Sequence, residues 1–137
     1  MAGTKKTSAT KAASSKAAGK DFGATFAALK KILQRHARRL CVKYDKPGNY
    51  YLETRSASFK GRPVFFGAVQ IKKSYVGFHL MPVYACPELL KGVSAELKSR
   101  MQGKSCFNFI RPDARLFSEL SRLTDAGFQK FRTRNLL

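Results

Sequence analysis

The spacing of hydrophobic positions divides the chain into helical and extended segments. From residue 22 to residue 40, apolar side chains recur at steps of three and four, which is the spacing of an amphipathic helix. Asp21 precedes this run and has the side chain of a helix N-cap. The positions predicted to form the buried stripe of this first helix are Phe22, Phe26, Leu29, Leu33, Ala37 and Leu40.

Four later segments are rich in β-branched and aromatic residues, and they predict strands. They span residues 50–54, 64–71, 75–81 and 105–110. Residues 41–44 fit either a short strand or the end of the first helix, and the Pro47-Gly48 pair that follows predicts a turn. Only Lys72-Lys73-Ser74 separates the second strand from the third, so we expect an antiparallel hairpin there.

The strand at residues 64–71 is apolar on both faces, which indicates a central or doubly covered position in the sheet. Strict alternation along a strand places Phe65 on the same face as Val69 and places Phe66 on the opposite face. We therefore expect Phe65 to gather with Phe78 and Phe107 in one hydrophobic core.

Helical spacing returns after the third strand. We expect a helix to begin at Pro87, to restart at a Ser94 cap, to run through Met101 and to end at Gly103. A final helix opens at Asp113. The order α-β-β-β-α-β-α predicts an α+β fold, in which a mostly antiparallel sheet packs against helices on one face.

The first 20 residues differ from the rest, because they hold five lysines, no acidic residue and no large apolar side chain after Met1. Ordering such a segment costs conformational entropy without burying apolar surface. We predict a disordered tail, rich in Lys, Ala and Ser, over residues 1–20, followed by a single domain over residues 21–137.

Positive charge is the outstanding property of the 137-residue chain, with 27 Lys and Arg against 8 Asp and Glu, a net charge of +19. Because the tail supplies five of the basic residues, the remaining 117 residues still carry +14. Such a charge attracts polyanions, of which nucleic acid is one, or serves only solubility. The basic residues predicted to grip phosphates are Lys5, Lys6, Lys11, Lys16 and Lys20 in the tail and Lys30, Lys31, Arg35, Arg38 and Arg39 on the first helix.

A different kind of site is predicted around the third strand. Tyr75 and His79 lie four residues apart and point the same way, and Lys73, Tyr84 and Lys104 are near them in sequence or in the expected fold. Aromatic rings with a cation at the mouth of a pocket fit a small planar or anionic ligand. In the alternative interpretation, a helix covers this face, His79 is hydrogen-bonded and Tyr75 is packed.

Catalytic and cofactor signatures are missing from the sequence. His36 and His79 are the only histidines, the acids are scattered, and no nucleophile elbow occurs. Gly103-Lys104-Ser105 lacks the upstream glycine of a phosphate loop and is followed by a strand. We expect no enzyme activity, no catalytic residue, no cofactor and no metal site.

Three well-separated cysteines without a secretory signal indicate reduced thiols, and hence a cytoplasmic protein. No apolar run reaches the roughly 18 residues that suggest a membrane span, so we expect no membrane partner.

Several motifs of the chain resemble the YdhG-like family of bacterial domains of unknown function. They are KSYVGFH at residues 73–79, MPVY at 81–84, the helical segment 89–97 and GKSCFNF at 103–109. The resemblance covers residues 50–132 and implies a compact α+β domain. Some members have been described as frataxin-like iron chaperones, but iron prefers carboxylate and imidazole ligands, which are scarce in this basic chain.

Two functional hypotheses follow from the sequence. The first is a small non-enzymatic binding domain, YdhG-like, whose ligand is unknown. The alternative is a nonspecific nucleic-acid-associated protein that grips phosphates through the tail and the basic helix faces, since no base-reading motif is present.

Overall fold

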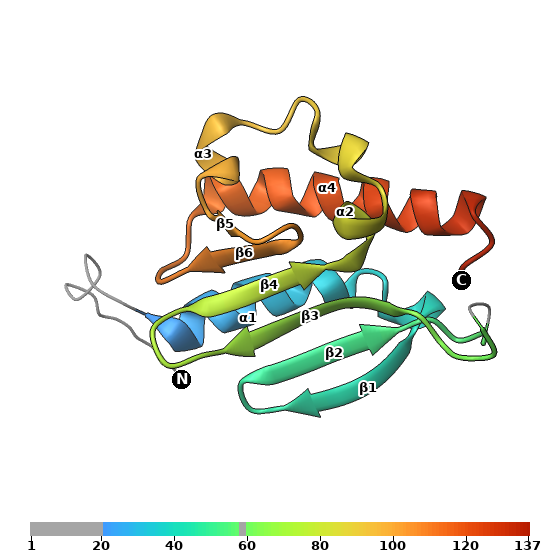
Figure 1. The fold of residues 1–137 in the computed structure, drawn as a ribbon. Helices are drawn as coiled ribbons and strands as arrows, with labels where there is room; N and C mark the ends of the chain where they lie inside the picture. The colour runs from blue at the N-terminus through green and yellow to red at the C-terminus, as the bar shows by residue number, and fades with distance from the viewer. Residues whose placement is uncertain (1–20, 58–59) are drawn as a thin grey trace.

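The computed structural model describes residues 21–57 and 60–137, which form one antiparallel sheet with helices on one of its faces (Figure 1). The sheet order is β1-β2-β3-β4-β6-β5. In chain order the elements are α1 (Phe22–Gln34), the 3-10 turn η1 (Ala37–Arg39), β1 (Cys41–Lys46), β2 (Asn49–Glu53), β3 (Phe65–Ile71), β4 (Val76–Leu80), α2 (Met81–Ala85), the 3-10 turn η2 (Pro87–Leu90), α3 (Ala95–Lys98), β5 (Met101–Gln102), β6 (Cys106–Phe109) and α4 (Ala114–Thr133). The predicted tail, with Lys5, Lys6, Lys11, Lys16 and Lys20, lies outside the described residues.

The predicted α+β class and the antiparallel sheet are confirmed, and the element order is close to the predicted one. The segment left open between strand and helix end is β1, which pairs with β2. A two-residue strand, β5, was not predicted. The region after β4 holds three short helical segments, α2, η2 and α3, where the sequence predicted a helix from Pro87 with one interruption.

Both long helices begin at the predicted caps. Asp21 Oδ1 accepts a hydrogen bond from the Ala24 N–H, and Asp113 Oδ1 accepts one from the Leu116 N–H, each at 3.1 Å. These carboxylates satisfy backbone donors that the first turn of a helix leaves unpaired, and their charge suits the positive end of the helix dipole.

The first helix is shorter than its hydrophobic spacing predicts, because α1 ends at Gln34 and the chain tightens into η1. The His36 ring stacks on Phe128 of α4 at 4.7 Å between centroids, and its Nε2 lies 2.8 Å from Asp125 Oδ1. Leu40 is still buried, so the apolar pattern continues to mark the core after the helix has ended. The helix therefore ends before its hydrophobic spacing does, next to the point where His36 contacts α4.

A β-bulge in β3 overturns the predicted assignment of its two phenylalanines. Leu52 pairs with Gly67 and Glu53 pairs with Phe65, which leaves Phe66 as the extra residue. Phe66 is fully buried and points toward α4, where its ring lies 5.6 Å from that of Phe131. Phe65 is turned to the opposite face of the sheet.

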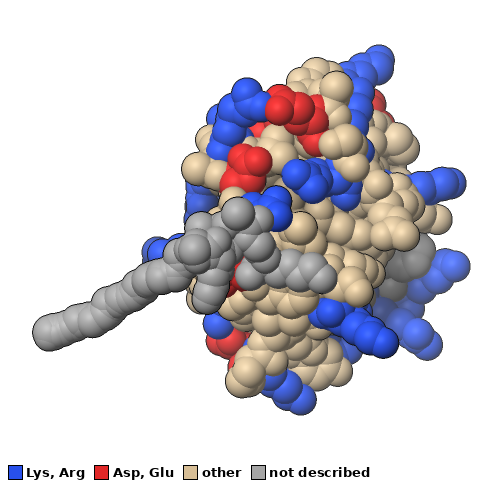
Figure 2. All heavy atoms as spheres, turned by 90° about the vertical axis from the view of Figure 1, so that its left-hand side faces the viewer, with Lys and Arg blue, Asp and Glu red and all other residues tan. Residues whose placement is uncertain are grey.

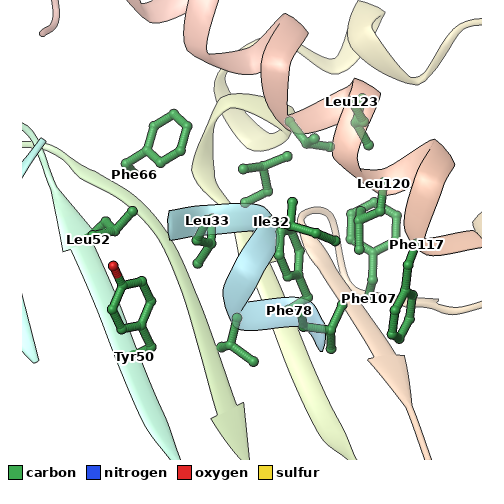
Figure 3. Packing of buried hydrophobic residues seen from close by; sticks show 14 of the residues in the cluster. Ile32, Leu33, Tyr50, Leu52, Phe66, Phe78, Phe107, Phe117, Leu120 and Leu123 are labelled. Atoms are coloured by element: carbon green, nitrogen blue, oxygen red, sulfur yellow. The ribbon is translucent and has the colours of Figure 1, made fainter. Parts of the chain in front are cut away.

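The core lies between the sheet and the helix pair α1 and α4, with side chains from β2, β3, β4 and β6 directed toward both helices (Figure 3). Phe78 and Phe107 are fully buried there, as predicted, and Phe65 is not part of this cluster. Burying one such ring contributes about 1.5–3 kcal/mol. This one-sided core leaves the other face of the sheet free of helices, at least as far as residues 21–57 and 60–137 are concerned.

The predicted role of Gly103 as a helix terminator is wrong. The helical segment ends at Lys98, and Met101 and Gln102 pair instead with Phe107 and Cys106. Gly103 has a φ of +81° in the tight turn between β5 and β6, a backbone conformation that glycine adopts without steric cost. The short hairpin forms because this turn folds the chain back onto the edge of β6.

Across the part of the chain that the structure describes, no helix combines the length and the apolar character that crossing a membrane requires.

Candidate functional site

The face of the sheet opposite α1 and α4, called the open face here, displays every second side chain of the strands. Tyr50 and Leu52 of β2 enter the core, whereas Tyr51 and Glu53 remain half-buried on the open face. In β4, Phe78 is buried and Gly77 and His79 face outward. Figure 1 shows α1 passing behind β3 and β4, on the other side of the sheet.

A groove of about 220 Å³ crosses the open face between β3, β4 and β6. No residue of a helix is among the described residues that line it, and Gly77 forms its floor. A Cβ at position 77 would lie 3.6 Å from Tyr75 Cε2 and 3.7 Å from Asn108 Oδ1, so a larger side chain at this position would occupy part of the groove. The lining residues are Ala68, Gln70, Lys72, Tyr75, Gly77, His79, Gln102, Cys106 and Asn108.

A second hollow, of about 340 Å³, continues the groove toward the sheet edge. The two share Tyr75, Gln102 and Asn108, and the second adds Arg100. Lys72 at one side and Arg100 at the other therefore give this continuous depression two cations.

Carboxamide groups supply most of its hydrogen-bonding capacity. Asn108 Nδ2 donates to Gln102 Oε1 at 2.7 Å, and Gln70 Nε2 donates to Asn49 Oδ1 at 3.2 Å. Each carboxamide has two donor hydrogens and an acceptor oxygen, so these bonds leave capacity for a ligand.

His79 and Cys106 are direct partners across β4 and β6, a placement that raises the question of nucleophilic catalysis. Burial lowers the pKa of His79, whereas burial raises the pKa of the Cys106 thiol and the charge of Lys72 partly offsets that rise. Both shifts favour the neutral forms, the reverse of an activated thiolate beside an imidazolium. The His79 ring instead meets the ring of Phe65 edge-on, with 4.8 Å between centroids.

Aromatic side chains on the open face form a continuous row from β1 to β4. Ring centroids are 5.6 Å apart for Tyr44 and Tyr51, 4.7 Å for Tyr51 and Phe65, and 4.8 Å for Phe65 and His79. We call these four side chains the aromatic row. The bulge at Phe66 brings Phe65 into it, and the row ends beside the groove because His79 belongs to both.

The residues predicted for a ligand site do not form one group. Tyr75 and His79 line the groove together. Tyr84 and Lys104 line a separate hollow of about 430 Å³ with Val83, and Lys73 lines neither of the two. Every second residue from Ala68 onward points to the open face, so Ala68, Gln70 and Lys72 lie there together. The lysine at the groove is therefore Lys72 and not the predicted Lys73.

The basic residues predicted on the first helix are partly engaged with the protein itself. Lys30 Nζ lies 2.8 Å from Asp45 Oδ1, and Arg35 lies 3.1 Å from Asp125 Oδ2. Lys31 is exposed. These pairs neutralise part of the charge that a polyanion would meet.

A basic hollow of about 450 Å³ lies where α1 turns into η1, lined by Arg35, His36, Arg38 and Arg39. At the end of the molecule seen in Figure 2, lysine and arginine side chains stand in separate groups, with acidic side chains between some of them. The hollow brings three arginines and a histidine together.

Metal ligands do not cluster in residues 21–57 and 60–137, where no three His, Cys, Asp or Glu side chains converge. Cys41 is exposed, Cys86 is buried and Cys106 is half-buried, and all three are free thiols.

No family model, curated protein or solved structure matches this chain.

Sequence reasoning found Tyr75 and His79 but missed Gln70, Asn108 and the aromatic row. Alternation along residues 64–71 and 105–110 was the available signal, since polar Gln70 and Asn108 interrupt otherwise apolar strands. Tyr44 and Tyr51 were assigned to segments whose pairing was unknown, and only the register of β1 with β2 makes them neighbours.

Proposed function

We propose that this protein is a non-enzymatic binding module that holds a small planar, anionic ligand in the groove on the open face of its sheet. The observation that carries the proposal is the groove itself, a concave site on a face that no described helix covers. Such a surface next to a well-packed core fits a binding function, because the core already accounts for the stability of the fold.

The chemistry of the lining supports a ligand of this kind. The Tyr75 and His79 rings offer flat surfaces, the carboxamides of Gln70 and Asn108 offer paired donors and acceptors, and Lys72 offers a positive charge. A base or another heteroaromatic ring that carries a phosphate or carboxylate would use all three features.

The proposal includes the YdhG-like assignment, a bacterial source and a cytoplasmic location. The α+β architecture agrees with what the resemblance implies for the fold. Three free thiols, one of them exposed, suit a reducing compartment.

The test follows the side-chain amide signals of Gln70, Gln102 and Asn108 in a two-dimensional NMR spectrum of the full chain. The probes are adenosine monophosphate, uridine monophosphate and indole carboxylate, each at millimolar concentration. The proposal predicts that at least one probe moves these signals while those of Gln34 and Gln129, on α1 and α4, stay in place.

Gly77→Val removes the concavity, and Gly77→Ala is a milder version whose Cβ makes only ordinary contacts. Both should weaken the response, whereas Gly23→Ala, whose Cβ meets nothing within 4 Å, should leave it unchanged. Groove signals that ignore every probe, or that move no more than those of Gln34 and Gln129, would overturn the proposal.

The second candidate is the phosphate-gripping, nucleic-acid-associated protein, favoured by the basic hollow at Arg35, Arg38 and Arg39. It predicts mobility-shift binding to duplex DNA that falls steeply between about 50 and 200 mM salt. The double variant Arg38→Gln and Arg39→Gln should lower the salt dependence, as should glutamine at the five tail lysines. Binding that both variants leave unchanged would exclude this candidate.

A further inference from the structure

The aromatic row extends beyond the groove and has no role in the small-ligand proposal. It crosses four adjacent strands, which are spaced about 4.8 Å apart in a sheet, and Tyr44 at its outer end is 37% exposed. Tyr51, Phe65 and His79 are half-buried, so each of these residues remains partly exposed to solvent. A continuous aromatic surface of this length is larger than one small ligand needs.

Positive charge accompanies the row at both ends. Lys43 Nζ lies 5.6 Å from the centroid of Tyr51, and Lys46 Nζ lies 5.2 Å from that of Tyr44. At the other end, Lys72 lines the groove and Arg100 lines the hollow that continues it. Glu53 also lies on the open face, and Lys43 Nζ lies 4.0 Å from its Oε2.

We propose that the aromatic row and the adjoining groove bind single-stranded nucleic acid, with bases stacked on the rings and phosphates beside Lys43, Lys46 and Lys72. Stacking on exposed aromatic side chains of a sheet, combined with cations that follow the backbone, is how proteins hold unpaired strands with little sequence preference. The carboxamides of Gln70 and Asn108 then meet the edge of one base at the groove. The chain's net charge of +19 suits this occupant.

A duplex does not fit the same surface. Its bases are stacked on one another and present only their edges, so the four rings would have no flat partner. Burial lowers the pKa of His79 and so favours the neutral imidazole, which contributes a ring surface.

This inference rests on the proposed function, because the groove forms one end of the surface that would bind the nucleic acid. Its test measures fluorescence anisotropy of the full chain with labelled strands of about 12 nucleotides, a length within the range that such surfaces cover. Single-stranded DNA, single-stranded RNA and duplex DNA are compared. Tighter binding of either single strand than of the duplex is expected.

Tyr51→Ala should weaken single-strand binding about tenfold, and Tyr44→Ala should also weaken it, whereas Tyr51→Phe keeps the ring and should stay within about twofold. Tyr84→Ala is the matched control, since Tyr84 is 56% exposed and lies on α2, away from the row. Thermal melting of each variant shows whether it is folded.

The charge contacts are tested by the salt dependence. Lys43→Gln with Lys46→Gln should lower the slope of log K against log salt by about 1.4, for two lost phosphate contacts. Lys31→Gln with Lys98→Gln, on α1 and α3, removes the same charge from the helix side and should change the slope less.

Duplex binding as tight as single-strand binding, or wild-type affinity in Tyr51→Ala, overturns the inference. Equal slopes for the two lysine pairs overturn it as well. If the groove amides respond to adenosine monophosphate but Tyr51→Ala binds the single-stranded nucleic acids as tightly as wild type does, only the inference fails. If those amides ignore all probes, the proposed function fails.

Discussion

The Phe65 ring meets the His79 imidazole edge-on at 4.8 Å between centroids, on the face of the sheet that looks away from α1 and α4. The contact exists because the β3 bulge exchanges the faces that plain alternation assigns to the two phenylalanines, so that Phe65 lies on the open face and Phe66 lies in the core. One local irregularity thus supplies a fully buried ring to the core and a half-buried ring to the candidate binding surface. Stability and binding are divided between two consecutive residues.

The two phenylalanines should differ sharply when truncated. Phe66→Ala removes a fully buried ring and should cost about 3–5 kcal/mol of unfolding free energy. Phe65→Ala, at a half-buried position, should cost about 1 kcal/mol. Urea denaturation of both variants measures the difference, and equal costs would contradict the assignment of the two faces.

A pair of glycines tests how α4 packs on α2. A Cβ at Gly127 would lie 2.8 Å from Pro82 Cβ, so Gly127→Ala forces a shift and should destabilise the protein by about 1–3 kcal/mol. Gly23→Ala, in open space on α1, should stabilise it by about 0.5–1 kcal/mol through helix propensity. Thermal unfolding of both variants should therefore move in opposite directions, and a stabilised Gly127→Ala would refute the close approach.

Glu119 of α4 holds the start of α3. The Ser94 N–H and hydroxyl each donate to its carboxylate at 2.7 Å, and these two bonds lower the pKa of Glu119. Because the folded-state pKa is depressed, the stabilisation is complete above the unfolded value of about 4.3 and disappears as the pH falls through the folded value. Glu119→Ala should cost about 1 kcal/mol at pH 7.

The difference between wild type and Glu119→Ala, measured by urea denaturation across a pH series, should shrink toward zero in acid. A difference that stays constant from neutral pH to acid would show that the carboxylate charge is not what stabilises this junction.

His79 should make the protein sensitive to mild acid. Burial depresses its folded-state pKa below the unfolded value of about 6.5, so the unfolded state takes up the proton first as the pH falls. Stability is therefore complete above the unfolded value and declines as the pH falls toward the folded one. His79→Gln should flatten this part of the stability profile, and an unchanged slope between pH 7.5 and pH 5.5 would contradict the burial of the imidazole.

The sequence predicted those parts of the fold that short-range chemistry specifies. Asp21 and Asp113 are caps because a carboxylate before an apolar run satisfies free backbone donors, and Lys72-Lys73-Ser74 turns because it separates two apolar strands by three polar residues. The same logic identified Tyr75 and His79 as neighbours on one face.

Features that depend on the pairing of strands could not be predicted from the sequence, because the register of one strand against another is not a local property. The bulge at Phe66 is set by the register of β3 against β2, and alternation alone placed Phe65 in the core. Just after the end of α1, His36 contacts Asp125 of α4, which is 89 residues away in the sequence. The aromatic row likewise forms only when β1 pairs with β2, so no pattern within a single segment of the sequence predicts it.

The most direct test of the account is a map of backbone amide chemical shifts in the full chain as a single-stranded oligonucleotide is added. If the open face binds it, the largest changes should fall on β1–β4 and β6, around Tyr51, His79 and Asn108, and α1 should change little. Changes concentrated at residues 35–39, with the strands unaffected, would contradict the central claim that the open face of the sheet is the binding surface.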